Sequence, residues 1–195
     1  MLNKLSIIIV DFLIMNNVVE LVNKELYQYG FFILLSDIFS ILLITFFGIF
    51  LNCFFESVLF YFIFRFIRIF AGGFHANTET RCEILISLLF LGSTYTISIS
   101  KQVNIFKIIL GITIFAILII TIFSPLDTPE KPLEPDEKKK YRKISLSILL
   151  IIVLIIIISI ILKIKLFIVP CCLSLILESI LLVAGVIKGR LVNGH

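Results

Sequence analysis

His75 and Cys82 are the two residues of this 195-residue chain whose types could make a nucleophile and its base. They lie in the polar stretch 68–82, between two long apolar runs, which contains one of only 2 histidines and one of 4 cysteines. A cysteine thiolate attacks carbonyl carbon, and an imidazole beside it can take the thiol proton. The pair therefore indicates nucleophilic catalysis, in a chain with few other groups suited to chemistry.

The spacing of this pair limits the structure around it. Seven residues of continuous helix would separate His75 from Cys82 by about 10 Å along the axis. Proton transfer needs the heavy atoms within about 3 Å. We therefore expect the chain to bend, and Gly72-Gly73 and Asn77-Thr78 are residue pairs that favour a bend.

Thr80 and Glu83 fit a capping box, which predicts Thr80 as the N-cap of a helix. Cys82 would then lie in the first turn, where unpaired N–H groups, the positive helix end and Arg81 favour a thiolate. Two other interpretations stay open from these residues alone: Cys82 as a small packing residue, and His75 as a solvated surface group. No metal site or cofactor is expected, because one internal histidine without clustered cysteines falls short of a ligand set.

The composition indicates a membrane protein. Hydrophobic residues make up 60% of the chain and charged residues 15%, and a soluble domain of this size cannot bury so much apolar surface. Cys53, Cys171 and Cys172 lie inside apolar runs, where free cysteine usually packs as a small hydrophobe. We predict an all-α integral membrane protein, because helices satisfy every backbone hydrogen bond in lipid.

About six transmembrane helices are expected, since one crossing takes about 20 apolar residues. The predicted spans are 31–51, 53–70, 82–99, 105–123, 144–162 and 167–187. The second span is the least typical because it contains Glu56, Arg65 and Arg68. In the simplest arrangement Glu56 would neutralise one of the two arginines.

The N-terminal residues 1–29 differ from the rest, because apolar and polar residues alternate in them near helical spacing. This pattern predicts an amphipathic interfacial helix region. An ordinary first helix packed on the bundle is the alternative. Residues 30–195 would form a single transmembrane helical domain.

Lysine and arginine predict the orientation of the chain. Only four of the 17 lysines and arginines fall on the outer side when six crossings start from a cytoplasmic N-terminus: Lys101, Lys107, Lys163 and Lys165. The positive-inside rule therefore places both termini and the loops 71–81 and 124–143 on the cytoplasmic side of the cell membrane. Cys82 would stay reduced there, as a nucleophile requires.

The segment from Arg68 through Gly72-Gly73-Phe74-His75-Ala76 to Cys82 resembles the accessory gene regulator B proteins of Gram-positive quorum sensing. The resemblance extends to the seven-residue spacing from His to Cys, the number of spans, the overall length and the segment Ser124-Pro125-Leu126-Asp127-Thr128-Pro129. It therefore covers nearly the whole chain. Outside these motifs the match is mainly one of hydrophobic pattern.

The resemblance implies a membrane cysteine endopeptidase that processes a small precursor peptide, the D component of the same system. Cys82 would be the nucleophile and His75 its base. The enzyme would remove the precursor's acidic C-terminal tail and hold the remainder as an acyl thioester on Cys82. An internal Cys or Ser of the precursor would then close a thiolactone or lactone ring, which requires that water be kept out.

Other residues are candidates for supporting roles. Backbone N–H groups near Cys82, or Arg68, could stabilise the developing oxyanion. The candidates for positioning the substrate or its acidic tail are Arg65, Arg68, Gly72, Gly73, Lys138, Lys139 and Lys140. The basic run 138–143 also suits anchoring to anionic lipid. Four residues could each orient His75, and none stands out: Glu56, Asn77, Glu79 and Glu83.

Three functions can be distinguished by one substitution. A peptide-processing enzyme loses tail cleavage in Cys82→Ala, a non-enzymatic membrane peptide transporter or exporter tolerates that change, and a membrane sensor or scaffold has neither activity. The few charges in the last three spans count against transport. The expected partners are the precursor peptide and the lipid bilayer, with no nucleic acid, and a homodimer stays open.

Overall fold

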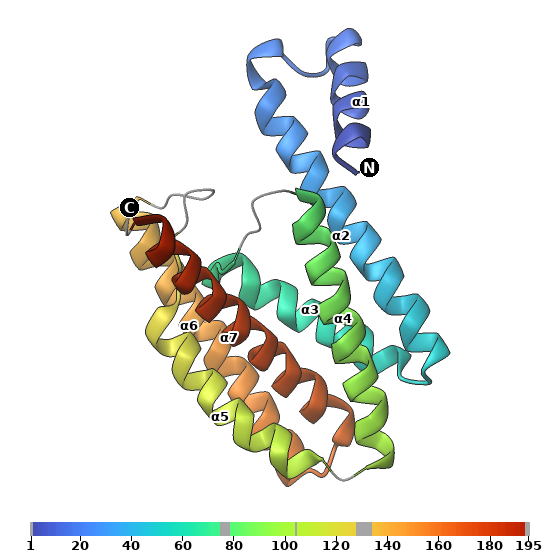
Figure 1. Cartoon of the computed structure of the whole chain (residues 1–195), viewed down its shortest axis with the longest axis vertical. Helices are drawn as coiled ribbons and strands as arrows, with labels where there is room; N and C mark the ends of the chain where they lie inside the picture. The colour runs from blue at the N-terminus through green and yellow to red at the C-terminus, as the bar shows by residue number, and fades with distance from the viewer. Residues whose placement is uncertain (1, 75–78, 104, 128–133, 194–195) are drawn as a thin grey trace.

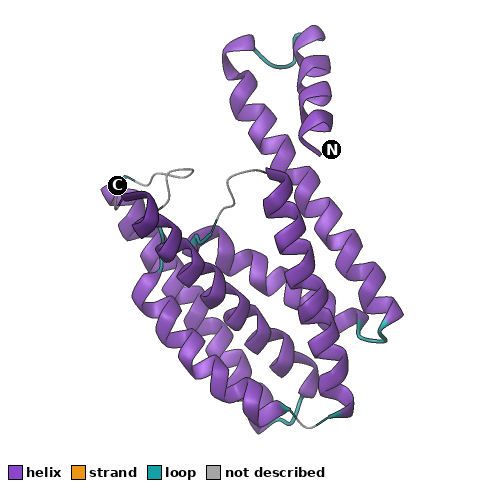
Figure 2. Cartoon of the chain, in the orientation of Figure 1, coloured by secondary structure: helices purple, strands orange, loops and turns teal. Residues whose placement is uncertain are grey.

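The computed structural model describes residues 2–74, 79–103, 105–127 and 134–193. This part of the chain is all-helical (Figure 1, Figure 2), which confirms the predicted fold class. The helices are α1 (Leu2–Met15), α2 (Lys24–Phe50), α3 (Phe54–Ala71), α4 (Glu79–Gln102), α5 (Phe106–Phe123), α6 (Pro135–Ile161) and α7 (Lys165–Asn193). A short 3-10 helix, η1 (Leu21–Asn23), precedes α2.

Five helices are long and apolar enough to cross a membrane, namely α2, α4, α5, α6 and α7. Helix α3 occupies the second predicted span, but Glu56, Arg65 and Arg68 are among its 18 residues. Length and composition therefore support five of the six predicted spans. Many large apolar side chains on the outer faces of these helices are exposed, as expected where lipid is the solvent.

Each charge in α3 has an ion-pair partner on a different helix. The pairs are Glu56 with Lys101 of α4 at 2.6 Å, Arg65 with Asp37 of α2 at 2.6 Å, and Arg68 with Glu178 of α7 at 3.8 Å. The expectation that Glu56 neutralises Arg65 or Arg68 is wrong. At least nine residues of one helix, or about 13 Å of axis, separate Glu56 from either arginine.

Helix α7 forms the centre of the bundle. It packs against α3, α4, α5 and α6, and Figure 1 shows it between α4 and the pair α5 and α6. Buried side chains of α3, α5, α6 and α7 form one apolar core, and those of α2, α3, α4 and α7 form a second. Cys53, Cys171 and Cys172 are buried in these cores, as predicted.

Helix α1 and the first half of α2 extend beyond the bundle at one end of the molecule (Figure 1). Helix α2 begins at Lys24, earlier than the predicted start at 31, and its 27 residues span about 40 Å, more than the roughly 30 Å of a hydrocarbon core. Figure 1 shows α1 beside the first half of α2, beyond the other helices. Asp11 pairs with Lys24 at 2.7 Å, and Gln28 donates a hydrogen bond to Asn3. The interfacial location of 1–29 stays a prediction.

The helix ends alternate between the two ends of the bundle. Figure 1 shows the ends of α3, α5 and α7 and the starts of α4 and α6 at the same end. The turn that ends α3 and the segment that follows α5 meet there, since the N–H of Leu126 donates to the carbonyl of Ala71, although they are far apart in the sequence.

Candidate active site

Cys82 is the fourth residue of α4 and is partly exposed, whereas Cys53, Cys171 and Cys172 are buried. The helix begins at Glu79. Thr80 therefore lies inside the first turn and is not the N-cap that the capping box predicts. Cys82 nevertheless occupies the first turn, where backbone N–H groups lack partners from a preceding turn.

His75 and Asn77 lie outside the described residues, but the segment that leads into His75 is described. Helix α3 ends at Ala71, and Gly72 and Gly73 have φ angles of 76° and 131°, which residues with a Cβ rarely adopt. The bend predicted at the glycine pair is confirmed. The N–H of Phe74 then donates to the carbonyl of Leu181 in α7 at 2.9 Å.

The segment after α5 packs on the end of α3. The N–H of Leu126 donates to the carbonyl of Ala71 at 2.9 Å. A Cβ added at Gly72 would lie only 2.6 Å from the carbonyl oxygen of Leu126. Arg142 of α6 donates to the carbonyl of Ser124 at 2.9 Å, so the Ser-Pro-Leu-Asp segment is itself tied to the bundle.

Gly185 allows α7 to approach the same turn. A Cβ there would lie 3.0 Å from the nitrogen of Phe74 and 3.1 Å from the carbonyl carbon of Gly73. One helical turn further, the Nζ of Lys188 lies 5.7 Å from the centroid of the Phe74 ring, within range of a cation–π interaction. Phe74, the residue directly before His75, is therefore held against α7.

The Arg68 side chain is largely buried and contacts backbone carbonyls and one carboxylate. It donates from Nη1 to the carbonyl of Gly72 at 2.8 Å and from Nη2 to the carbonyl of Phe74 at 2.6 Å. Nη1 also lies 3.8 Å from a carboxylate oxygen of Glu178, and the two side chains are 9% and 0% exposed. These contacts indicate that Arg68 stabilises the turn after α3. They leave it less suited to bind an oxyanion or a peptide tail.

Arg65 is one turn away from Arg68 and has a different environment. Its Nε and Nη2 donate to the same carboxylate oxygen of Asp37, at 3.0 and 2.6 Å. The guanidinium is partly exposed, so a substrate carboxylate that reached it would compete with Asp37.

The basic run is helical and does not belong to a loop 124–143 as predicted. Helix α6 begins at Pro135, and the N–H of Glu134 donates to a carboxylate oxygen of Glu137 at 3.4 Å, a start favoured by proline at the first helical position. Lys138 lies 4.0 Å from Asp127 and Lys139 lies 3.7 Å from Asp136, with 52% and 83% of their side chains exposed. Lys140 is also exposed. These three lysines therefore project from the first turns of α6.

The structure narrows the choice of a residue that orients His75. About 24 Å of helix separates Glu56 from Gly72, and Glu56 pairs with Lys101 at that far end, so Glu56 is excluded. Glu83, next to Cys82, accepts a hydrogen bond from the Oγ of Ser36 at 3.4 Å. The side chains of Asn77 and Glu79 lie outside the described residues.

Glu178 was not singled out from the sequence. It is 0% exposed, and neither of its carboxylate oxygens has a hydrogen-bond partner among the described residues. The available signal was a single acidic residue in the middle of an apolar span, since ionisable residues inside membranes usually mark a function.

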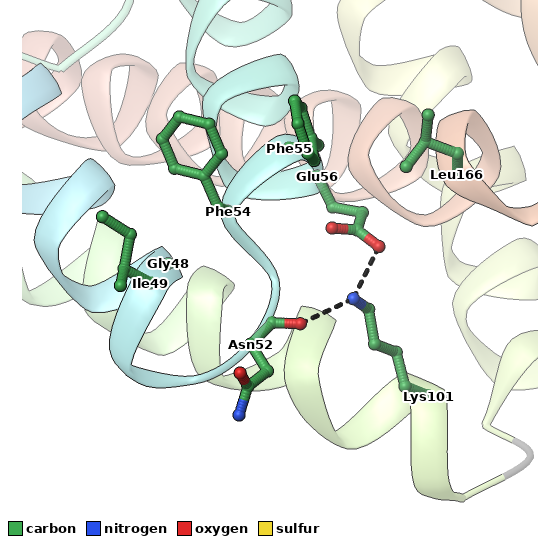
Figure 3. Close-up of a pocket in the computed structure, with 8 residues that line it drawn as sticks. All are labelled: Gly48, Ile49, Asn52, Phe54, Phe55, Glu56, Lys101 and Leu166. Carbon is green, nitrogen blue, oxygen red and sulfur yellow. Dashed lines mark hydrogen bonds and ion pairs between the residues drawn. The ribbon is translucent and has the colours of Figure 1, made fainter.

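A cavity of about 490 Å³ lies at the opposite end of α3 (Figure 3). It is lined by Gly48, Ile49, Asn52, Phe54, Phe55, Glu56, Lys101 and Leu166. Figure 3 shows Lys101 reaching both the carboxylate of Glu56 at 2.6 Å and the carbonyl of Asn52 at 2.8 Å. Cys82 does not line this cavity. Within the described ranges, no three His, Cys, Asp or Glu side chains gather as metal ligands.

Comparison with protein families gives a match to the accessory gene regulator B model over residues 6–182. An AgrB-like protein of Clostridium perfringens (strain SM101 / Type A) is 34% identical over 133 residues, which are 65% of this chain and 62% of that relative. AgrB-like protein 2 of Clostridium perfringens (strain 13 / Type A) is 32% identical over 132 residues, with the same coverage of 65% and 62%. The match spans less than two thirds of these relatives. No solved structure matches the chain.

Proposed function

The chain belongs to the accessory gene regulator B family, and from this premise we propose that it is a membrane-embedded cysteine endopeptidase that processes a quorum-sensing precursor peptide. Cys82 is the nucleophile and His75 is its base. The observation that carries the proposal is the accessibility of the cysteines. Cys82 is partly exposed in the first turn of α4, and the other three are buried.

The proposed reaction has two steps. The imidazole of His75 takes the proton of the Cys82 thiol, and the thiolate attacks the carbonyl carbon at the start of the precursor's acidic tail. The C–N bond breaks, the tail's amino group takes the proton from the imidazolium, and the rest of the precursor stays on Cys82 as a thioester. An internal Cys or Ser of the precursor then attacks the thioester, closes the thiolactone or lactone ring and releases the thiol.

Backbone N–H groups of the first turn of α4 are the proposed donors to the oxyanion of the first step, because such groups point away from the helix start and need partners. Arg68 is less suited to this task, since two of its nitrogens already donate to Gly72 and Phe74. Substrate binding must therefore use other cations.

Lys138, Lys139 and Lys140 are the proposed site for the acidic tail. They start α6 at the same end of the bundle as the start of α4 (Figure 1). The acidic partners of Lys138 and Lys139 are surface groups at 4.0 and 3.7 Å, and such exposed pairs exchange at little cost. The positive-inside rule puts this end, with both termini, in the cytoplasm.

The test uses the full chain in lipid vesicles with a synthetic precursor that has an amphipathic start, a central Cys and an acidic end. Mass spectrometry follows the free tail, the ring product and any adduct on the protein. We expect tail release with the wild-type chain and none with Cys82→Ala or His75→Ala. Cys172→Ala is the matched control, because that thiol is fully buried and should be dispensable.

A mass increase on wild-type protein equal to the precursor without its tail, absent from Cys82→Ala, would identify the thioester. Tail release by Cys82→Ala at the wild-type rate would exclude the mechanism. Precursor crossing the vesicle membrane intact in that variant would favour the transporter alternative.

A further inference from the structure

Glu178 is a costly residue for the centre of this bundle. It is the one acidic side chain of α7, it is 0% exposed, and its carboxylate has no hydrogen-bond partner in the described part of the chain. Burying a carboxylate without full compensation is strongly unfavourable. The ion pair with Arg68, at 3.8 Å, is therefore its main compensation, and packing alone does not explain a glutamate at this position.

Arg68 connects Glu178 to the turn before His75. Its Nη1 donates to the carbonyl of Gly72 and lies 3.8 Å from a carboxylate oxygen of Glu178, and its Nη2 donates to the carbonyl of Phe74. A planar guanidinium can serve several acceptors at once only when its orientation is fixed. The negative charge of Glu178, 3.8 Å from Nη1, favours this orientation of the guanidinium.

Backbone hydrogen bonds connect both ends of the turn to other segments of the chain. Phe74 donates to Leu181 in α7, and Leu126 donates to Ala71 at the end of α3. Leu181 is three residues after Glu178, so one turn of α7 holds the guanidinium and the backbone of Phe74 together. Phe74 is followed directly by His75 in the sequence.

We propose that Glu178 is a positioning residue for the cysteine–histidine chemistry: through Arg68 it fixes the turn Gly72–Phe74 and with it the origin of the segment that carries His75. This inference rests on the proposed function. It assigns a mechanistic task to a side chain that touches neither the nucleophile nor the substrate.

The competing explanation is an ion pair that only stabilises the fold. The two explanations predict different catalytic activity when both charges are removed together. Replacing a buried ion pair by apolar residues of similar size is often neutral or stabilising, so Arg68→Met/Glu178→Met should keep its stability. The double variant has no donors for the carbonyls of Gly72 and Phe74, so the turn should loosen and catalysis should fall.

The experiment compares the wild-type chain, Glu178→Gln and Arg68→Met/Glu178→Met in vesicles. Lys101→Gln is the matched control, because it breaks an ion pair of α3 at 2.6 Å at the other end of that helix. Four quantities are measured: thermal stability, kcat and KM for tail cleavage, and the hydrogen–deuterium exchange of the peptide that contains the Phe74 amide.

We expect both variants at Glu178 to lower kcat, the double variant by about 100-fold, the order of loss for a catalytic group misplaced by about 1 Å. KM should change little, since the tail binds elsewhere. The Phe74 amide should exchange faster in both, and Lys101→Gln should match the wild-type chain in kcat and in this exchange. Unchanged kcat in a folded double variant would overturn the proposal.

Hydrogen exchange separates this inference from the proposed function, because it needs no substrate. If the wild-type chain cleaves no precursor, the peptidase proposal fails, and the exchange rate still decides whether Glu178 fixes the turn. An unchanged Phe74 amide in Glu178→Gln and in the double variant overturns the inference whatever the activity. If the double variant does not fold, the kcat and exchange of Glu178→Gln, which keeps the side-chain shape, decide the question.

Discussion

Gly185→Ala tests the close approach of α7 to the turn before His75. The added Cβ would collide with the side chain of Leu126 and would lie 3.0 Å from the nitrogen of Phe74 and 3.1 Å from the carbonyl carbon of Gly73. Two of these three contacts are with backbone, which cannot rotate away as a side chain can. The turn or α7 must therefore move.

The size of the effect follows from a comparison with Gly189, one turn further along α7. A Cβ at Gly189 meets nothing within 4 Å, so Gly189→Ala should show only the helix gain of about 0.5–1 kcal/mol. Gly185→Ala has the same gain but adds overpacking that costs about 1–3 kcal/mol. The two variants should therefore differ in stability by about 1–3 kcal/mol, with Gly185→Ala the less stable.

The buried cysteines provide the assay. In a Cys82→Ser background, a fluorogenic maleimide reports unfolding only when Cys53, Cys171 and Cys172 become accessible, because all three are buried in the folded chain. A thermal ramp gives the order of the two variants. Tail cleavage is measured separately with Cys82 intact, where Gly185→Ala should lower kcat about 10- to 100-fold and Gly189→Ala should not. Equal stability and equal cleavage for the two variants would refute the packing argument.

Three further outcomes are expected. Changing 138–140 together to glutamine should raise KM for a precursor with an acidic tail severalfold and leave kcat unchanged, with the difference shrinking at high salt; Lys165→Gln, at the other end of the bundle, serves as the control, and equal KM values would exclude tail binding there. Gly72→Ala should destabilise the chain by about 1–3 kcal/mol, because its φ is 76° and its Cβ would meet the carbonyl of Leu126; unchanged stability would contradict this. Under native conditions a maleimide should label one thiol quickly, and labelling that persists in Cys82→Ser would show that another cysteine is accessible.

The helices of this chain could be predicted because a backbone in lipid must satisfy all its hydrogen bonds within the segment, as a helix does. Every apolar run became a helix, including the isoleucine-rich run of α6, since an unpaired backbone group in hydrocarbon is more costly than a poor helix propensity. Helix starts were predicted less well. Helix α6 begins at Pro135 and not at 144, because lysine and glutamate are good helix formers and the backbone hydrogen bonds continue into polar sequence.

The parts of the site that could be predicted are those encoded locally. The glycine pair ends α3 as expected, since φ angles of 76° and 131° suit only glycine. Cys82 falls in the first turn of α4 as expected. The prediction of Thr80 as the N-cap is wrong, because α4 begins at Glu79, two residues before the predicted first helical residue. A capping pattern of four residues does not by itself determine where a helix starts.

Ion-pair partners could not be predicted from spacing. Glu56, Arg65 and Arg68 share one short helix, so pairing among themselves is the simplest arrangement on the sequence. Their partners lie on three other helices. Which helix faces which charge depends on how the whole bundle packs, and apolar faces that look alike in sequence carry no such information.

The three ion pairs of α3 differ in burial, and this difference separates their roles. The pairs of Glu56 and Arg65 include partly exposed groups, where water or lipid headgroups can replace a partner, so each contributes little. The pair of Arg68 and Glu178 is buried in the bundle, where loss of either charge leaves the other without an oppositely charged partner. A buried ion pair is weak support for stability and stronger support for a fixed geometry. The geometry in question is the turn Gly72–Phe74 that precedes His75. If His75 is the base, as we propose, the polar group that we expect to position it lies on α7, far from His75 in the sequence.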